Sequence, residues 1–204
     1  AREIFIRINS AGIRLAKADE NFTLATTVHL RDHVEDTKKD LQSGFNEISD
    51  DAMQNTIALY YGANRIGGTE FKSALNARLK QNTKQTDFRT EWKKIENGYK
   101  LCVDFLASEF LIKNLKELPI SNMFSMLSFF FAINGKKATP YQIKQIRKWF
   151  WHTCLNKRYS GSEFNKNIPN DIKLFRSLAS GKQVSYTINK KVNVFDFMRS
   201  DYRE

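Results

Sequence analysis

The sequence predicts a mostly α-helical fold, a domain of several helices that occupies residues 16–204. Over most of this range apolar side chains recur at intervals of three and four residues, which is the period of a helix with one buried face. Hydroxyl residues and a proline stand where these helices would begin, and glycines stand where they would end. Residues 184–193 show the alternation typical of a strand, and a short strand or an extended segment is expected there.

Residues 1–15 have a different character. Ile4–Ile8 form an apolar segment from which Arg7 projects, and Asn9, Ser10 and Gly12 follow in a turn. An arginine followed by an amide, a hydroxyl and free backbone N–H groups can hold a phosphate. The alternative is an ordinary connection before a helix, which satisfies only its own backbone. Arg7, Asn9, Ser10 and Gly12 are therefore candidate ligands of an anion.

The first long helix is expected over residues 18–43, ended by Gly44. Within it, His29 and His33 have the four-residue spacing of two metal ligands on one helix face. Metalloproteases of this pattern need a glutamate directly after the first histidine, but Leu30 stands there, and no third ligand is evident. A solvated or core-edge position is the favoured interpretation, so no metal site is predicted.

Four more helices are predicted before residue 135. Their ranges are 50–61 after a cap at Ser49, 70–79 after Thr69, 87–114 after Thr86, and 120–133. The helix over 87–114 has the clearest period, with one apolar stripe from Phe88 to Phe110. The helix over 120–133 is apolar nearly all round, which predicts that it is the central buried helix.

Basic and aromatic residues are interleaved in the next helix. Thr139 and Pro140 are a strong helix start, and the helix is expected to run to about Asn156. Interleaved charges and rings can grip phosphates and stack on bases. The candidate nucleic-acid-binding residues are Lys144, Arg147, Lys148, Lys157, Arg158 and Tyr159. The alternative is that the aromatic rings belong to the core and that the last basic residues only favour the helix dipole. A final helix is predicted from Pro169 to Ser180.

The net charge of +11 is unevenly spread along the chain. Residues 1–135 carry 18 Lys and Arg against 17 Asp and Glu, whereas residues 136–204 carry 15 against 5. A polyanion is the simplest partner for such a field, so DNA is the expected ligand of the last third. An acidic protein surface, or an acidic domain of the same protein, is the alternative.

Two stretches carry a family resemblance. Phe-x-Arg-Ile-Asn-Ser-x-Gly-x-x-Leu-x-x-x-Asp, read from Phe5 to Asp19, resembles the second signature of the ParB-like restriction family typified by the GmrSD modification-dependent endonucleases. Trp-Phe-Trp at 149–151, Arg-Tyr-Ser-Gly-Ser at 158–162 and Asn-Asp-Ile at 170–172 resemble its helical C-terminal part. The family's first signature, Asp-Gly-Gln-Gln-Arg, does not occur here, so the chain looks like a fragment. Residues 1–15 would end the ParB-like α/β part, as a short remnant or edge of it.

The resemblance implies a nucleotide-dependent restriction or phage-defence protein as the parent. It implies that Arg7, Asn9, Ser10 and Gly12 contribute to nucleotide binding, with a nucleoside triphosphate and a divalent metal as cofactors of the parent and none held by the fragment alone. The implied partners are DNA, the missing ParB-like region and a possible HNH-type nuclease domain. No catalytic residue is assigned to these 204 residues, which are expected to be inactive alone. The alternative is a non-catalytic helical module that binds nucleic acid or an acidic protein.

The number of cysteines and the hydropathy of the sequence indicate the cellular compartment of the protein. Cys102 and Cys154 are too few and too far apart for a disulfide framework, and both lie among apolar residues, which predicts buried free thiols. Free thiols suit a cytoplasmic protein. The sequence shows no signal peptide and no apolar run long enough to span a bilayer, so no membrane association is predicted.

Overall fold

The structure is a computed structural model that describes residues 29–42, 44–81, 85–156, 158–159 and 161–188. The predicted mostly α-helical, multi-helix fold is confirmed, and no strand occurs in these ranges. The α-helices are α3 (Leu30–Asp40), α4 (Asp50–Tyr60), α5 (Gly68–Lys80), α6 (Gln85–Phe110), α7 (Ser121–Asn134), α8 (Pro140–Leu155) and α9 (Gly161–Ala179). A short 3₁₀ helix, η2 (Leu115–Glu117), joins α6 to α7.

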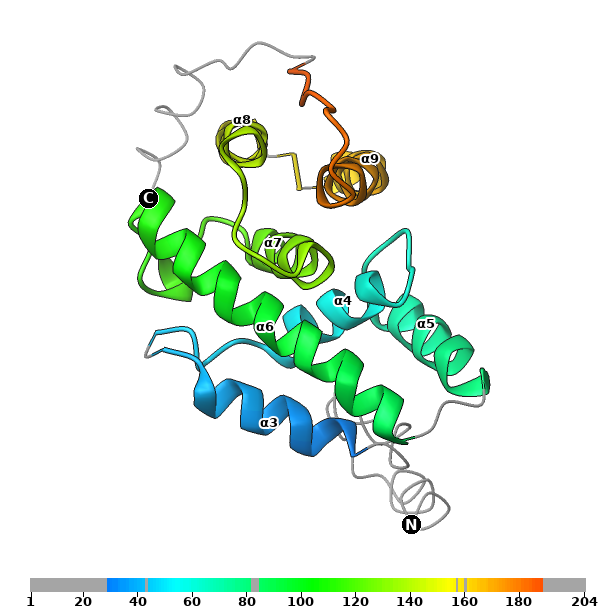
Figure 1. Cartoon of the computed structure of the whole chain (residues 1–204). Coiled ribbons are helices and arrows are strands. Elements are labelled where there is room, and N and C mark those ends of the chain that lie inside the picture. Colours follow the sequence, from blue (N-terminus) through cyan, green and yellow to red (C-terminus); the bar gives the residue numbers. More distant parts are fainter. Residues whose placement is uncertain (1–28, 43, 82–84, 157, 160, 189–204) are drawn as a thin grey trace.

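Helix α7 is the centre of the domain. Figure 1 shows α6 and α4 on one side of α7, with α8 and α9 on the other and α3 outside α6. Every residue from Met123 to Ala132 is buried. Phe131 packs against Phe105 of α6, and Phe130 packs against Phe175 of α9. The sequence prediction of an all-round apolar central helix is therefore confirmed.

A glycine sets the spacing between the two helices that make the largest contact. A Cβ atom added to Gly98 of α6 would lie 2.7 Å from the backbone N and Cα of Ala132 in α7. Real Cβ atoms do not approach backbone atoms so closely, so only glycine fits here without a shift of the helices. The absent side chain offsets the low helix propensity of glycine by allowing close packing.

Several helix starts follow from local sequence. Ser49 caps α4 by accepting a hydrogen bond from the Ala52 N–H, as predicted. Thr139 and Gln142 form a reciprocal capping box at the start of α8. The predicted cap at Thr69 is wrong, because α5 begins after Gly67. The Gly67 N–H donates instead to Asn55 of α4 at 2.9 Å, a tertiary contact that the local sequence does not show.

Other helix boundaries also differ from the predictions. Helix α6 begins at Gln85 rather than after Thr86 and ends at Phe110, because Leu111 has a positive φ of 58°. Helix α9 begins at Gly161, eight residues before the predicted start, and contains Pro169 in its interior. Residues 184–188, the described part of the predicted strand or extended segment, belong to no strand and no helix. The prediction of one continuous helix over 18–43 is wrong, because α3 begins at Leu30 after His29, which has a left-handed backbone, and ends at Asp40. Residues 18–28 and the segment 189–202 lie outside the described residues.

Two further findings concern the cysteines and membranes. Cys102 is buried and Cys154 is half-buried, and both are free thiols. Of the helices in the described ranges, none is both long enough and apolar enough to cross a bilayer.

Candidate nucleic-acid interface

Four residues of α8 form a basic and aromatic surface, which we call the α8 face: Lys144, Arg147, Lys148 and Trp151. Their spacings of three, four and seven residues place them on one side of a helix. All four are exposed, while Trp149 and Phe150 point into the core. Trp151 is 52% exposed, which is unusual for the largest apolar side chain. The α8 face combines cations with a ring that is accessible to a ligand.

Neighbouring aromatic rings hold the Trp151 side chain in place. Its ring meets those of Phe110 and Phe150 edge-on, at centroid distances of 5.9 and 5.4 Å. Phe110 and Phe150 are themselves stacked at 3.8 Å. Because one side of the indole rests on this pair, the ring has a supported position at the surface, ready for a flat or apolar partner.

The cations of the α8 face differ in their availability. Arg147 forms an ion pair with Glu109 at the end of α6, so part of its charge is already compensated. Lys144 and Lys148 form no ion pair or hydrogen bond with any residue that the structure describes. Neither lysine has a structural task within this part of the chain. Exposed lysines of this kind are free to contact phosphates.

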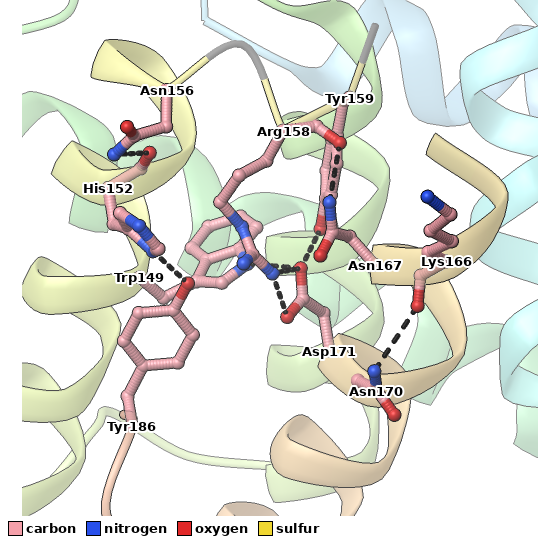
Figure 2. Close-up of polar contacts among 10 residues, drawn as sticks. All are labelled: Trp149, His152, Asn156, Arg158, Tyr159, Lys166, Asn167, Asn170, Asp171 and Tyr186. Carbon is pink, nitrogen blue, oxygen red and sulfur yellow. Dashed lines mark hydrogen bonds and ion pairs between the residues drawn. The ribbon is translucent and has the colours of Figure 1, made fainter. Parts of the chain in front are cut away.

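The predicted pair Arg158 and Tyr159 lies elsewhere, around the carboxylate of Asp171 (Figure 2). Arg158 Nη2 lies 2.7 Å from Asp171 Oδ1 and 2.8 Å from Oδ2, and Tyr159 donates its hydroxyl to Oδ2 at 2.8 Å. Trp149 of α8 donates its Nε1–H to the same oxygen at 3.0 Å. Asp171 is 2% exposed, so this is an internal cluster, which we call the Asp171 cluster: Trp149, Arg158, Tyr159 and Asp171.

Burial defines the chemistry of the Asp171 cluster. Tyr159 is only 7% exposed, and burial followed by the Asp171 charge raises the pKa of its hydroxyl well above the usual value. The hydroxyl therefore stays a donor to the carboxylate, and its ring is covered. The Arg158 side chain is 14% exposed. Both side chains attach the connection between α8 and α9 to Asp171 of α9, and neither belongs to the α8 face. The structure does not describe Lys157.

A second internal contact joins the chain after α9 to α8. The Tyr186 hydroxyl lies 2.6 Å from Nδ1 of buried His152, and the Tyr186 N–H donates to Gln145 Oε1 at 2.8 Å. Tyr141 and Ser185 approach at 3.4 Å between their hydroxyl oxygens. These contacts attach residues 184–188, which we call the C-terminal strap, along one flank of α8.

The predicted anion ligands Arg7, Asn9, Ser10 and Gly12 lie outside the described residues, so no geometry is assigned to them. His29 has a positive φ of 51° and precedes α3, whereas His33 lies within α3 and stacks on Trp92 at 5.5 Å. Burial, and next the nearby Arg89, lowers the pKa of His33. In the described ranges no three His, Cys, Asp or Glu side chains are grouped so that they could hold a metal ion.

Sequence reasoning missed Asp171, Tyr186 and His152 as interacting residues. A signal for Asp171 was present, since it and Glu163 are the only acidic residues between positions 136 and 188 of a strongly basic stretch. An isolated carboxylate in such a stretch is expected to have a specific cationic partner. The pairing of His152 with Tyr186 spans 34 residues and has no local signature.

Comparison with known proteins adds no relative. No protein-family model matches the chain, and neither a curated protein nor a solved structure is matched by it. The family resemblance therefore stays a prediction.

Proposed function

We propose that this domain binds DNA through the α8 face. The observation that carries the proposal is the exposed Trp151 among three cations on one side of α8. Lys144 and Lys148 would contact phosphates and release counterions from the DNA, which is the main source of sequence-independent affinity. Trp151 would pack on a sugar or stack on an accessible base. The excess of 15 basic over 5 acidic residues in positions 136–204 would attract the polyanion.

The broader proposal follows the family resemblance. In a GmrSD-like, nucleotide-dependent restriction or defence protein, this helical domain would be the scaffold and the DNA-contacting part. Arg7, Asn9, Ser10 and Gly12 would then contribute to a nucleotide site that the ParB-like region completes. An Asp-Gly-Gln-Gln-Arg signature in the sequence that precedes this chain in its gene would support this assignment, and a complete gene without it would contradict the assignment.

One observation favours a second candidate function, binding of an acidic protein surface. Glu109 already pairs with Arg147, so a carboxylate fits this face. Phe110 and the 77% exposed Leu111 lie beside it and would give a protein partner an apolar contact. The two candidates differ in their ligand, DNA or a carboxylate-rich protein.

Tryptophan fluorescence tests DNA binding at the α8 face directly. Trp92 and Trp149 are 3% and 0% exposed, so a ligand on the surface should quench mainly Trp151. Titration with duplex DNA at about 50 mM salt should quench the emission and raise the anisotropy of labelled DNA together. Trp151→Phe should keep most of the anisotropy change and lose the quenching.

Two outcomes would contradict the DNA proposal. Binding without quenching in the unmodified protein would place the DNA away from Trp151. Absence of binding at about 50 mM salt would exclude DNA and leave the acidic protein as the candidate ligand.

A further inference from the structure

A cleft with both polar and apolar lining separates α9 from the C-terminal strap, and none of the residues of the α8 face lines it. Its volume is about 350 Å³, within the range of small-molecule sites. Helix α9 contributes Lys173 and Ser177, and the strap contributes Ser185 and Thr187. Arg158 of the Asp171 cluster lines the cleft as well. Two basic residues and three serine or threonine residues therefore line one concave space.

Arg158 is held rigidly at this cleft but is not saturated. Its contacts with both oxygens of Asp171 come from Nη2 alone, as Figure 2 shows. Its Nε–H is buried and has no acceptor among the residues that the structure describes. Buried donors without an acceptor are rare in folded proteins and call for a partner such as an ion or water. Because the Nε atom is inaccessible, a ligand in the cleft can approach only the exposed part of the Arg158 side chain, which the ion pair with Asp171 holds in place.

The charge balance of the cleft favours an anion. Asp171 is the only carboxylate that lines the cleft in the described ranges, and it is compensated by Arg158 and by the hydrogen bonds from Trp149 and Tyr159. Lys173 is exposed and forms no ion pair with any described residue. The net charge that the cleft offers to a ligand is therefore positive.

The remaining lining is apolar and aromatic. Leu174 of α9 and Val184 of the strap border the cleft, and the Tyr186 ring lies beside Arg158, with the guanidinium carbon 5.5 Å from the ring centroid. An inorganic anion would leave these groups without a contact. A ligand with an anionic head and an organic body would use both kinds of lining.

We infer that the cleft between α9 and the C-terminal strap binds an organic phosphate. The phosphate lies against the part of the Arg158 side chain that lines the cleft and against the Lys173 ammonium, where an arginine and a lysine supply directed and point-charge contacts. The hydroxyls of Ser185 and Thr187 donate to the remaining oxygens, and the organic group covers Leu174 and Val184. This site shares no residue with the α8 face, so it stands independently of DNA binding.

Titration with inorganic phosphate and phenyl phosphate, followed by NMR at constant ionic strength, tests the inference. The side-chain resonances of Arg158 and Lys173 should shift to saturation, and phenyl phosphate should bind more tightly than phosphate because its ring gains the apolar contacts. Lys173→Ala should weaken binding about tenfold, since a charge-assisted contact is lost. Lys166→Ala is the matched control, an exposed lysine of α9 that pairs with Glu163, and should leave binding unchanged.

Three results would overturn the inference. A linear, non-saturating shift would show only general ionic effects. Equal loss of affinity in Lys173→Ala and Lys166→Ala would show that no defined cleft is involved. A shift of Arg158 by a short DNA duplex but by neither phosphate would assign the cleft to the DNA interface instead.

Discussion

The guanidinium of Arg158 and the carboxylate of Asp171 form an ion pair inside the domain, with Nη2 within 2.8 Å of both carboxylate oxygens. Trp149 and Tyr159 donate to the same carboxylate. These residues come from the three separate stretches on which the resemblance of the helical part depends. Their shared contact shows that this pattern has a structural role, because it fixes α8 against α9.

Asp171→Asn is expected to destabilise the domain by about 3 kcal/mol or more, because it leaves the mostly buried Arg158 without its counter-charge. Chemical denaturation would measure the loss in the free energy of unfolding. Glu163→Gln removes a carboxylate that pairs with Lys166 at the surface and should change stability by about 0.5 kcal/mol or less. Equal effects of the two substitutions would show that the Asp171 cluster does not hold the helices together.

Gly98→Ala should destabilise the domain by about 1–3 kcal/mol, although glycine to alanine within a helix ordinarily stabilises. The reason is the 2.7 Å approach of the new Cβ to the Ala132 backbone. Asn97→Ala changes the neighbouring exposed position of α6 and should be neutral or slightly stabilising. A thermal midpoint for Gly98→Ala at or above that of the unmodified protein would contradict the close packing of α6 on α7.

Phe130→Ala should cost about 3–5 kcal/mol, because its fully buried ring fills the space between α7 and α9. Leu111→Ala removes an apolar side chain that is 77% exposed and should change stability by less than about 0.5 kcal/mol. Denaturation midpoints of the two variants give the comparison. A mild effect at Phe130 would mean that α7 is not the central helix.

The helical core could be predicted from the sequence, whereas most of its polar contacts could not. The apolar run from Met123 to Phe131 has only one favourable environment, the interior, so the position of α7 followed from composition. Thr139 caps α8 through Gln142, which is only three residues away in the sequence, so this cap was also predictable. The cap of α5 and the pair of His152 with Tyr186 depend on residues brought together only by folding.

The candidate interface was predicted in part. Lys144, Arg147 and Lys148 are exposed together, as their spacing indicates, but Arg158 and Tyr159 turn inward toward Asp171. Charge alone could not separate the two groups, because the separation depends on where α9 places one carboxylate. The predicted start of α9 at Pro169 was wrong, since proline ordinarily ends or begins a helix rather than lying within one.

Both cysteine thiols should react more slowly in the folded protein than in the unfolded chain, and their reaction rates should rise only at high pH. Burial raises the pKa of Cys102 to about 12 and that of Cys154 to about 11, so less of the reactive thiolate is present at neutral pH than in a free cysteine. At about pH 8 the folded protein should react with iodoacetamide far more slowly than the unfolded chain, and Cys154 should react before Cys102. Fast alkylation of Cys102 in the folded protein, located by mass spectrometry, would contradict its burial.

The salt dependence of DNA affinity tests the central claim most directly. Lys144→Glu/Lys148→Glu should weaken duplex binding at about 50 mM salt at least tenfold and lower the slope of log affinity against log salt by up to about 2, at roughly 0.9 per phosphate contact. Lys93→Glu/Lys94→Glu makes the same charge change at two exposed lysines of α6 and should leave the slope almost unchanged. The result that would contradict the α8 face is an equal loss of affinity and slope in both variants, or no loss in the first.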